Sequence, residues 1–219
     1  MPNRAAILLS AALLGLTLGS APVFAVPLVD RGAALAGLSS DDPAQRAEAI
    51  VWLADHGTEA DSKLLYPRLR DESARVRSDA ESALWALWSR SGDPALDELL
   101  ARGVEQMNAG RQRQAIATFS QVIRKMPSFT EAWNKRATAY YLAGRYRESI
   151  TDCRQVLKRN PRHFGALSGL GQIYLALGDD ERALAWFRRA LAVDPNLVGV
   201  ALTIKALEDK IEHRRDRMI

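Results

Sequence analysis

Residues 130–163 read TEAWNKRATAYYLAGRYRESITDCRQVLKRNPRH, and residues 164–197 follow the same pattern as FGALSGLGQIYLALGDDERALAWFRRALAVDPNL. Both segments have glycine at the fifteenth position and proline at the thirty-second, and so does a less regular copy over residues 96–129. A fixed period of 34 residues is typical of repeat proteins, in which similar units stack on one another. The pattern therefore predicts three structural units over residues 96–197.

The residues of each unit predict a pair of antiparallel helices. The eighth position holds glycine or alanine, and the twentieth holds alanine or serine. Small residues at these two facing positions let two helices approach closely. The glycine at the fifteenth position allows the chain to turn between the helices. The proline ends the second helix because it cannot continue the hydrogen-bonded ladder.

This arrangement resembles the tetratricopeptide repeat (TPR). The resemblance covers residues 96–197, within a TPR segment of residues 93–197, and it implies an all-α fold, a right-handed α-solenoid of stacked helical hairpins. Arginine stands in place of the usual leucine at Arg102 and Arg136, and Gln106 replaces the usual tyrosine. These departures affect the first unit most.

The region before the TPR units, residues 26–92, repeats with a step of 31 residues. The matching pairs are Leu38 with Leu69, Asp41 with Glu72, Arg46 with Arg77, Glu48 with Asp79, Ala49 with Ala80 and Leu53 with Leu84. This spacing is similar to that of short HEAT-type repeats, in which acidic and arginine positions link neighbouring units. Two unrelated amphipathic hairpins are the alternative interpretation.

Helix signals in this region fall at equivalent places in the two copies. Asp42 followed by Pro43 predicts an N-cap and a proline in the first turn of a helix that ends near His56. The equivalent helix starts at residues 71–73. Under both interpretations we expect one continuous solenoid in which these helices stack onto the TPR units, with a hinge near residues 91–94.

Residues 198–219 follow the last repeat. Their apolar positions recur at helical spacing, at Val198, Ala201, Leu202, Ile204, Leu207 and Ile211. Such a stripe predicts a helix that continues to about Arg217 and caps the last repeat. The basic end of this segment suits the negative end of a helix dipole.

Residues 1–25 have the order of a secretory signal. Arg4 is followed by an uncharged apolar stretch over residues 5–19 and then by a small-residue ending, so we expect cleavage after Ala25. The apolar stretch is shorter than the roughly 20 residues that cross a bilayer comfortably. An uncleaved membrane anchor is the alternative.

Two short strings, WNKRA at residues 133–137 and DCR at residues 152–154, look like those of a group of bacterial exported TPR proteins. Together with the signal, this resemblance predicts export, to the bacterial periplasm, and no membrane contact after cleavage. The resemblance implies a fold and assigns no activity.

The composition excludes several classes of function. The chain has 47% hydrophobic and 26% charged residues and a formal net charge of +4, and no run of basic residues indicates a nucleic-acid surface. A single cysteine, Cys153, excludes a disulfide within the chain and a zinc site made of cysteines, and its repeat position predicts a buried, inert thiol.

The histidines, His56, His163 and His213, lie near predicted helix ends, where we expect them at the surface. We therefore expect no catalytic residue, no metal and no cofactor.

The resemblance to TPR proteins also implies a binding surface, because the first helices of such units line a concave groove. The concave positions include Glu131 and Gly165, together with the residues that we select as the candidate partner-binding set: Asn134, Thr138, Tyr141, Ser168, Gln172 and Leu175. Asn134, Thr138 and Gln172 offer hydrogen bonds to an extended peptide backbone. Tyr141 and Leu175 offer apolar contact.

One type of partner is not expected in this groove. Chaperone-binding TPR domains grip a C-terminal carboxylate with a set of lysine and asparagine side chains. Leu100 and Val104 occupy two of the corresponding places in this chain. A groove filled by other segments of the same chain is the alternative to a partner.

The sequence as a whole indicates a non-catalytic, exported scaffold that binds a protein or an extended peptide in the TPR groove. We expect no nucleic acid and no small-molecule substrate among its partners. Two alternatives remain, a membrane-tethered envelope assembly factor and an accessory subunit of an enzyme.

Overall fold

The computed structural model describes residues 30–216, and the expected signal over residues 1–25 lies outside this range. The described residues form α-helices and short 3-10 helices and contain no strand, which confirms the all-α class. The N-terminal unit, a name used here for residues 30–88, consists of α1 (Arg31–Gly37), α2 (Pro43–His56), η1 (Glu59–Asp61), α3 (Ser62–Leu65), η2 (Tyr66–Arg70) and α4 (Ala74–Trp88).

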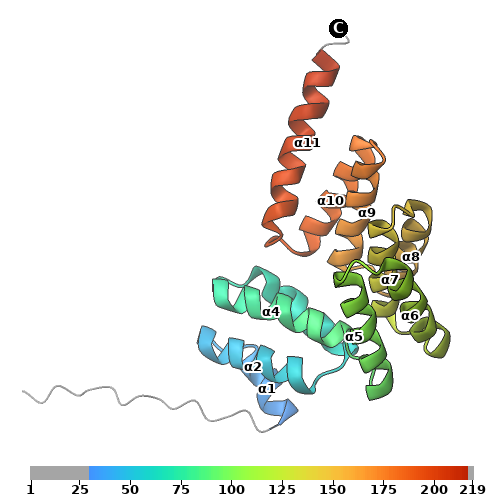
Figure 1. The fold of residues 1–219 in the computed structure, drawn as a ribbon. Coiled ribbons are helices and arrows are strands. Elements are labelled where there is room, and N and C mark those ends of the chain that lie inside the picture. The colour runs from blue at the N-terminus through green and yellow to red at the C-terminus, as the bar shows by residue number, and fades with distance from the viewer. Residues whose placement is uncertain (1–29, 217–219) are drawn as a thin grey trace, which may run out of the picture.

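Three helix pairs and a long last helix follow the N-terminal unit, and Figure 1 shows them in chain order. The helices are α5 (Pro94–Asn108) with α6 (Gln112–Lys125), α7 (Thr130–Leu142) with α8 (Tyr146–Arg159), α9 (Phe164–Ala176) with α10 (Asp180–Val193), and α11 (Val198–Asp216). The second and third pairs each fall within one 34-residue unit of the sequence, and the first pair begins at Pro94, two residues before its unit. Each second helix packs against the first helix of the next pair, so the pairs form a stacked array.

The turn inside each pair depends on its glycine. Gly110, Gly144 and Gly178 have φ values of +71°, +71° and +75°, a conformation that side chains with a Cβ atom rarely adopt. The chain reverses direction at these positions, and in each pair the second helix begins two residues later. The turns that the sequence predicts are therefore confirmed.

The two helices of a pair meet where a small residue faces a large one. A Cβ atom on Gly171 would lie only 2.5 Å from Phe187 Cδ1, and Gly103 has the same close contact with Phe119. In the middle unit the corresponding residues are Ala137 and Cys153. There the Ser149 hydroxyl donates a hydrogen bond of 2.7 Å to the Ala137 carbonyl. Ser149 and Ala137 occupy the twentieth and eighth positions, which the sequence pattern places opposite each other.

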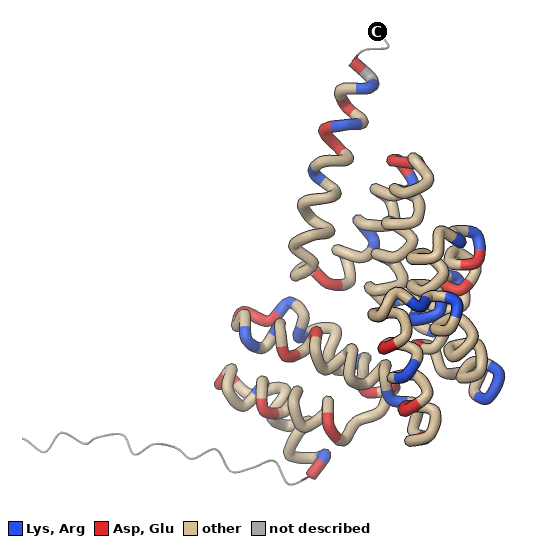
Figure 2. Tube along the Cα trace, in the orientation of Figure 1, with Lys and Arg blue, Asp and Glu red and all other residues tan. Residues whose placement is uncertain are grey.

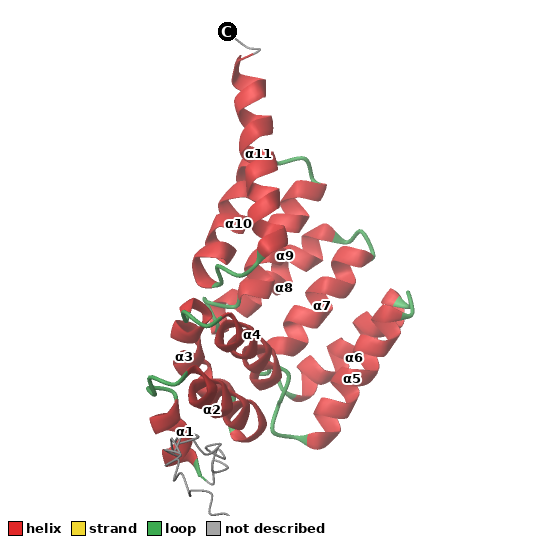
Figure 3. Cartoon of the chain, turned by 90° about the vertical axis from the view of Figure 1, so that its left-hand side faces the viewer, coloured by secondary structure: helices red, strands yellow, loops and turns green. Residues whose placement is uncertain are grey.

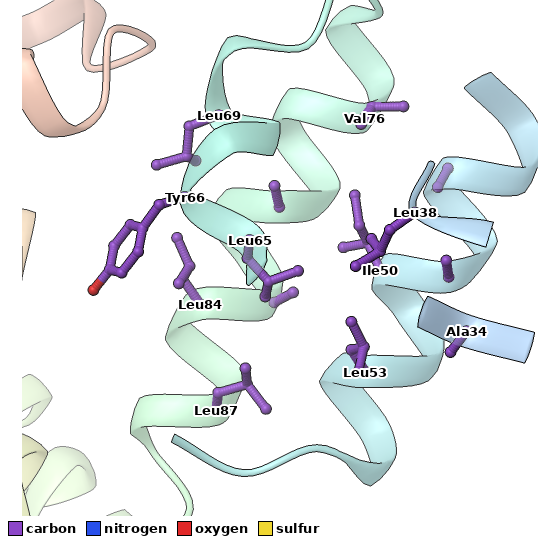
Figure 4. Packing of buried hydrophobic residues seen from close by; sticks show 14 of the residues in the cluster. Ala34, Leu38, Ile50, Leu53, Leu65, Tyr66, Leu69, Val76, Leu84 and Leu87 are labelled. Carbon is purple, nitrogen blue, oxygen red and sulfur yellow. The ribbon is translucent and has the colours of Figure 1, made fainter. Parts of the chain in front are cut away.

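The N-terminal unit has a core of its own, made by leucine-rich faces of α2, α4 and the short helices between them (Figure 4). The Asp42 carboxylate accepts a hydrogen bond from the Ala44 N–H, which confirms the predicted N-cap of α2. Arg46 reaches from α2 to the Asp71 carboxylate at 2.7 Å. This pair links the two copies of the 31-residue pattern.

The N-terminal unit is placed differently from the expected continuous stack. It does not extend the array from α5 but packs against the loops that follow α8 and α10 (Figure 3). The Tyr66 hydroxyl donates to Asn160 Oδ1 at 3.0 Å, and Arg77 Nε donates to Asn196 Oδ1 at 2.9 Å. Phe164 joins the core of the N-terminal unit. This edge-on contact is a feature that the sequence pattern did not predict.

The last helix, α11, lies against α10. Ile204, Leu207 and Ile211 are buried in this contact, and the buried Asp180 carboxylate on α10 is paired with Lys210 and Arg214. The second half of the predicted stripe thus faces the array, whereas Val198 and Leu202, 68% and 66% exposed, face solvent, contrary to the prediction. Among the described helices, none combines the length and the apolar character that crossing a membrane requires.

The close contact at Gly171 gives a first testable prediction. The change Gly171→Ala places a methyl group against Phe187 and should lower the free energy of unfolding by about 1–3 kcal/mol, the usual cost of overpacking a core. Gly199→Ala on α11 is the matched control, because a Cβ atom there meets no neighbour within 4 Å. Urea unfolding of both variants measures the effect, and equal stabilities would contradict it.

Candidate functional site

Four of the six candidate residues lie around one pocket between α7 and α9. Asn134, Thr138 and Tyr141 line it from α7, and Gln172 lines it from α9. The pocket has a volume of about 250 Å³. Its remaining lining residues are Ala137, Leu142, Ser149, Cys153, Gly165, Gly169 and Ile173. The repeat register therefore brings together residues that are more than 30 positions apart.

The other two candidates, Ser168 and Leu175, are not lining residues of this pocket. Both are on α9, and they differ from the lining residues of that helix by their position around its axis. The Ser168 hydroxyl is buried and has no hydrogen-bond partner among the described residues. The structure thus separates the candidate set into a group of four and a group of two.

The polar groups at the pocket differ in how freely they can bind a ligand. Gln172 is exposed to solvent, so its amide is available. Asn134 is buried and donates through Nδ2 to both carboxylate oxygens of Glu131, at 3.1 and 3.2 Å. The Thr138 hydroxyl donates to the Asn134 carbonyl at 3.1 Å, one helical turn before it. The Tyr141 ring packs beside Tyr146 and is half-buried.

A buried ionic cluster lies next to the pocket, at the first turns of α7 and α9. Glu131 and His163 are both fully buried, and His163 Nε2 is 3.0 Å from Glu131 Oε2. Lys135 Nζ lies 2.9 Å from the other carboxylate oxygen of Glu131. His163 Nδ1 accepts a hydrogen bond from the Ala166 N–H, so Nε2 carries the proton that is donated to Glu131. The expectation that His163 is a surface residue is wrong.

The Glu131 carboxylate is stabilised in its ionised form despite its burial. Burial raises the pKa of Glu131, but the hydrogen bond from His163 and the positive charge of Lys135 together lower it by more. The net pKa therefore lies below the ordinary value for a glutamate. A charge with these partners can remain in a water-free position.

Two tryptophans of α4 cover this cluster. The Trp88 ring stacks on His163 with ring centroids 4.2 Å apart, and a Cβ atom on Gly165 would lie 2.5 Å from Trp85. The Lys135 ammonium lies 5.3 Å from the Trp85 ring centroid. The N-terminal unit therefore covers the concave positions Glu131 and Gly165. In this part of the groove, α4 of the same chain occupies the space. This agrees with the alternative interpretation, in which other segments of the chain fill the groove.

The one cysteine lies at the floor of the pocket and is buried. Burial raises the pKa of the Cys153 thiol to about 12, and the neighbouring Asp152 carboxylate contributes to the increase. Asp152 itself is paired with Arg136 at 2.7 Å. A thiol that stays protonated at neutral pH is a poor nucleophile. The prediction of a buried thiol is confirmed, and its raised pKa is consistent with low reactivity.

Comparison with known proteins agrees with this architecture. A family model for the tetratricopeptide repeat matches residues 100–154 and 134–197. A TPR repeat-containing protein of Rhizobium etli is 30% identical over 182 residues, which cover 81% of this chain and 89% of that protein. The chain therefore belongs to the TPR repeat-containing proteins, as the sequence pattern predicts.

Solved structures of TPR domains share the fold of the repeat segment. The Sgt2 TPR domain of Aspergillus fumigatus is 21% identical, with a TM-score of 0.53, and the match covers 57% of this chain and 83% of that one. The secretion chaperone SycD of Yersinia enterocolitica is 14% identical, with a TM-score of 0.53 and coverages of 55% and 96%. The first TPR domain of RPAP3 is 20% identical, with a TM-score of 0.51 and coverages of 53% and 93%.

The ionised Glu131 gives a prediction for the effect of pH. Because its pKa is lower in the folded chain than the ordinary 4.5, the unfolded chain binds more protons in acid. The stability that Glu131 contributes is complete above about pH 4.5 and is lost as the pH falls through the lower, folded value. We expect Glu131→Gln to reduce the free energy of unfolding at pH 7 by about 1–3 kcal/mol.

The same variant should also weaken the dependence of stability on pH below 4.5, which urea unfolding between pH 7 and pH 3 measures. Glu148→Gln is the matched control, because Glu148 forms a solvent-exposed pair with Arg145. Exposed ion pairs contribute about 0–1 kcal/mol. If Glu131→Gln behaves like the control, the cluster does not stabilise the ionised carboxylate.

Proposed function

We propose that this protein is an exported, non-catalytic scaffold that binds an extended segment of a partner protein in its concave groove. The observation that carries the proposal is the pocket between α7 and α9, where the repeat register brings Asn134, Thr138, Tyr141 and Gln172 together. An extended segment across these two helices would meet an exposed amide at Gln172 and an aromatic ring at Tyr141.

A solved relative supports a peptide as the occupant. The first TPR domain of RPAP3 has been solved with an HSP90 peptide, SRMEEVD, and its fold matches the repeat segment of this chain. That peptide contains two glutamates and ends in aspartate. In this chain, Leu100 is buried, Val104 is half-buried, and α9 carries no charged residue. We therefore propose a peptide partner of a different kind, without a recognised C-terminal carboxylate.

The non-catalytic part of the proposal rests on the chemistry at the pocket. Its one candidate nucleophile, Cys153, is held as a neutral thiol. The Glu131 carboxylate and the His163 imidazole next to the pocket are bonded to each other, and Trp88 stacks on His163. These groups stabilise the junction with the N-terminal unit and are not directed into the pocket. Binding is the activity that such an arrangement supports.

Site-specific photo-cross-linking tests the groove as the binding surface. A photoreactive phenylalanine analogue in place of Gln172 should form an adduct with a partner in cells of the source organism, and Tyr141→Ala should reduce that adduct. The same analogue in place of Gln121, an exposed residue of α6, is the matched control. Adducts of equal yield at both positions, or no loss with Tyr141→Ala, would contradict binding in the groove.

The exported location is tested by the N-terminus of the protein isolated from its source. Cleavage after Ala25 yields a chain that begins at Val26, and intact-mass measurement identifies this chain. The soluble periplasmic fraction should contain it. A full-length chain in the membrane fraction would instead support the membrane-tethered alternative.

A further inference from the structure

The pocket between α7 and α9 borders two glycines of the third unit, at positions where the second unit has charged side chains. Gly165 and Gly169 stand at the second and sixth positions of their unit, where the second unit has Glu131 and Lys135. In the second unit these two side chains form an ion pair between the buried Glu131 and the half-buried Lys135. On α9 the absence of a side chain at Gly165 leaves room for the Trp85 ring of α4, and the absence of one at Gly169 leaves open space, where the nearest atom to a Cβ would be Cys153 Sγ at 3.7 Å. Both glycines line the pocket. The glycines thus distinguish α9 of the third unit from α7 of the second.

The interior of this pocket carries no charge. All of its lining residues are uncharged, and α9 has no Lys, Arg, Asp or Glu along its length (Figure 2). Two ion pairs lie beside the lining residues, Glu131 with Lys135 at 2.9 Å and Asp152 with Arg136 at 2.7 Å, and in each pair the opposite charges neutralise each other. A charged ligand group would lose its water here and gain no counter-charge, which is unfavourable. An apolar group would exchange water for contact with Ala137 and Ile173, which is favourable.

The size of the pocket suits a single side chain. A cavity of about 150 Å³ lined by apolar side chains is large enough to hold benzene. The pocket here has about 250 Å³, so it has room for an aromatic ring or a branched aliphatic group with its first backbone atoms. Gln172 is exposed at the pocket, where its amide can bond to the backbone on either side of such a side chain.

We propose that this pocket is an anchor site for one uncharged apolar side chain, aromatic or branched aliphatic, at an internal position of the partner segment. The proposal deepens the function proposed above and rests on it for the identity of the partner as a peptide. Recognition is then by an apolar anchor and backbone hydrogen bonds, with no part for a terminal carboxylate.

Titration with capped amino acids tests the chemistry of the pocket without knowledge of the partner. The probes are N-acetyl-phenylalanine amide and N-acetyl-leucine amide, compared with the N-acetyl amides of glutamate and lysine. Backbone amide signals in nitrogen-15 NMR spectra report binding, and the signals of Gly165 and Gly169 report it at the pocket itself. We expect saturable shifts at these glycines with the two apolar probes, and at least tenfold weaker responses with the charged ones.

A variant that fills the pocket identifies the site. A Cβ atom on Gly169 would lie 3.7 Å from Cys153 Sγ, an ordinary contact, so Gly169→Leu adds its side chain without a clash at the backbone. Gly199→Leu is the matched control, in a helix position with open space around it. We expect Gly169→Leu to abolish the response to the apolar probes and Gly199→Leu to leave it unchanged.

Two results would overturn the anchor site. The first is a response to the charged probes equal to that of the apolar ones. The second is an apolar response that survives Gly169→Leu. Either result can occur while photo-cross-linking at position 172 still captures a partner, in which case the groove binds a peptide by other contacts. Conversely, apolar probes that bind at Gly169 without any cross-linked partner would support the anchor site and contradict the proposed function.

Discussion

The close approach of the two helices within each TPR pair is the constraint on which the rest of the array depends. The eighth and twenty-fourth positions share one space, which holds glycine with phenylalanine in the first and third units. In the middle unit the space is divided differently, between Ala137 and Cys153. The methyl group of Ala137 occupies part of the volume that a phenylalanine ring fills in the other pairs. The smaller Cys153 side chain packs against this methyl group. Cys153 then lines the pocket together with the glycines of α9, so helix packing inside the neighbouring pair contributes to the shape of the pocket.

A second constraint acts in the N-terminal unit, where two equivalent arginines, Arg46 and Arg77, bond to the carbonyl groups of the preceding loops. Arg46 donates to the carbonyls of Ser40 and Asp41, and Arg77 donates to the carbonyls of Asp71 and Glu72, at the same spacing. Arg46 then reaches the next copy of the pattern at Asp71. Arg77 has no further copy to reach, and its Nε bonds to Asn196 in the loop after α10. The repeated contact therefore ends on the TPR array and helps to fix the unit there.

The features of the fold that depend on residues close together in the chain could be predicted from the sequence. The period of 34 residues, the turn glycines, the N-cap at Asp42 and the start of α11 at Val198 all depend on neighbours within a turn or two of helix. The candidate site was predicted in part, because the register fixes which residues of α7 and α9 lie on one side. Gly165, Gly169 and Gln172 form one stripe along α9, whereas Ser168 and Leu175 form the adjacent one, and the register alone does not distinguish the two.

What the sequence did not predict is the docking of the N-terminal unit, and with it the burial of His163. The contacts that fix this docking join residues about 75 to 120 positions apart, such as Trp88 with His163 and Arg77 with Asn196, and no periodic pattern encodes them. The docking of the N-terminal unit also affects the pocket between α7 and α9. Trp85 and the Glu131 cluster hold the first turns of α7 and α9, one helical turn from Gly169. Because the helices on both sides of the pocket are already held in place, few side chains lose conformational freedom when a ligand binds. Most of the free energy of the ligand contacts therefore contributes to the affinity.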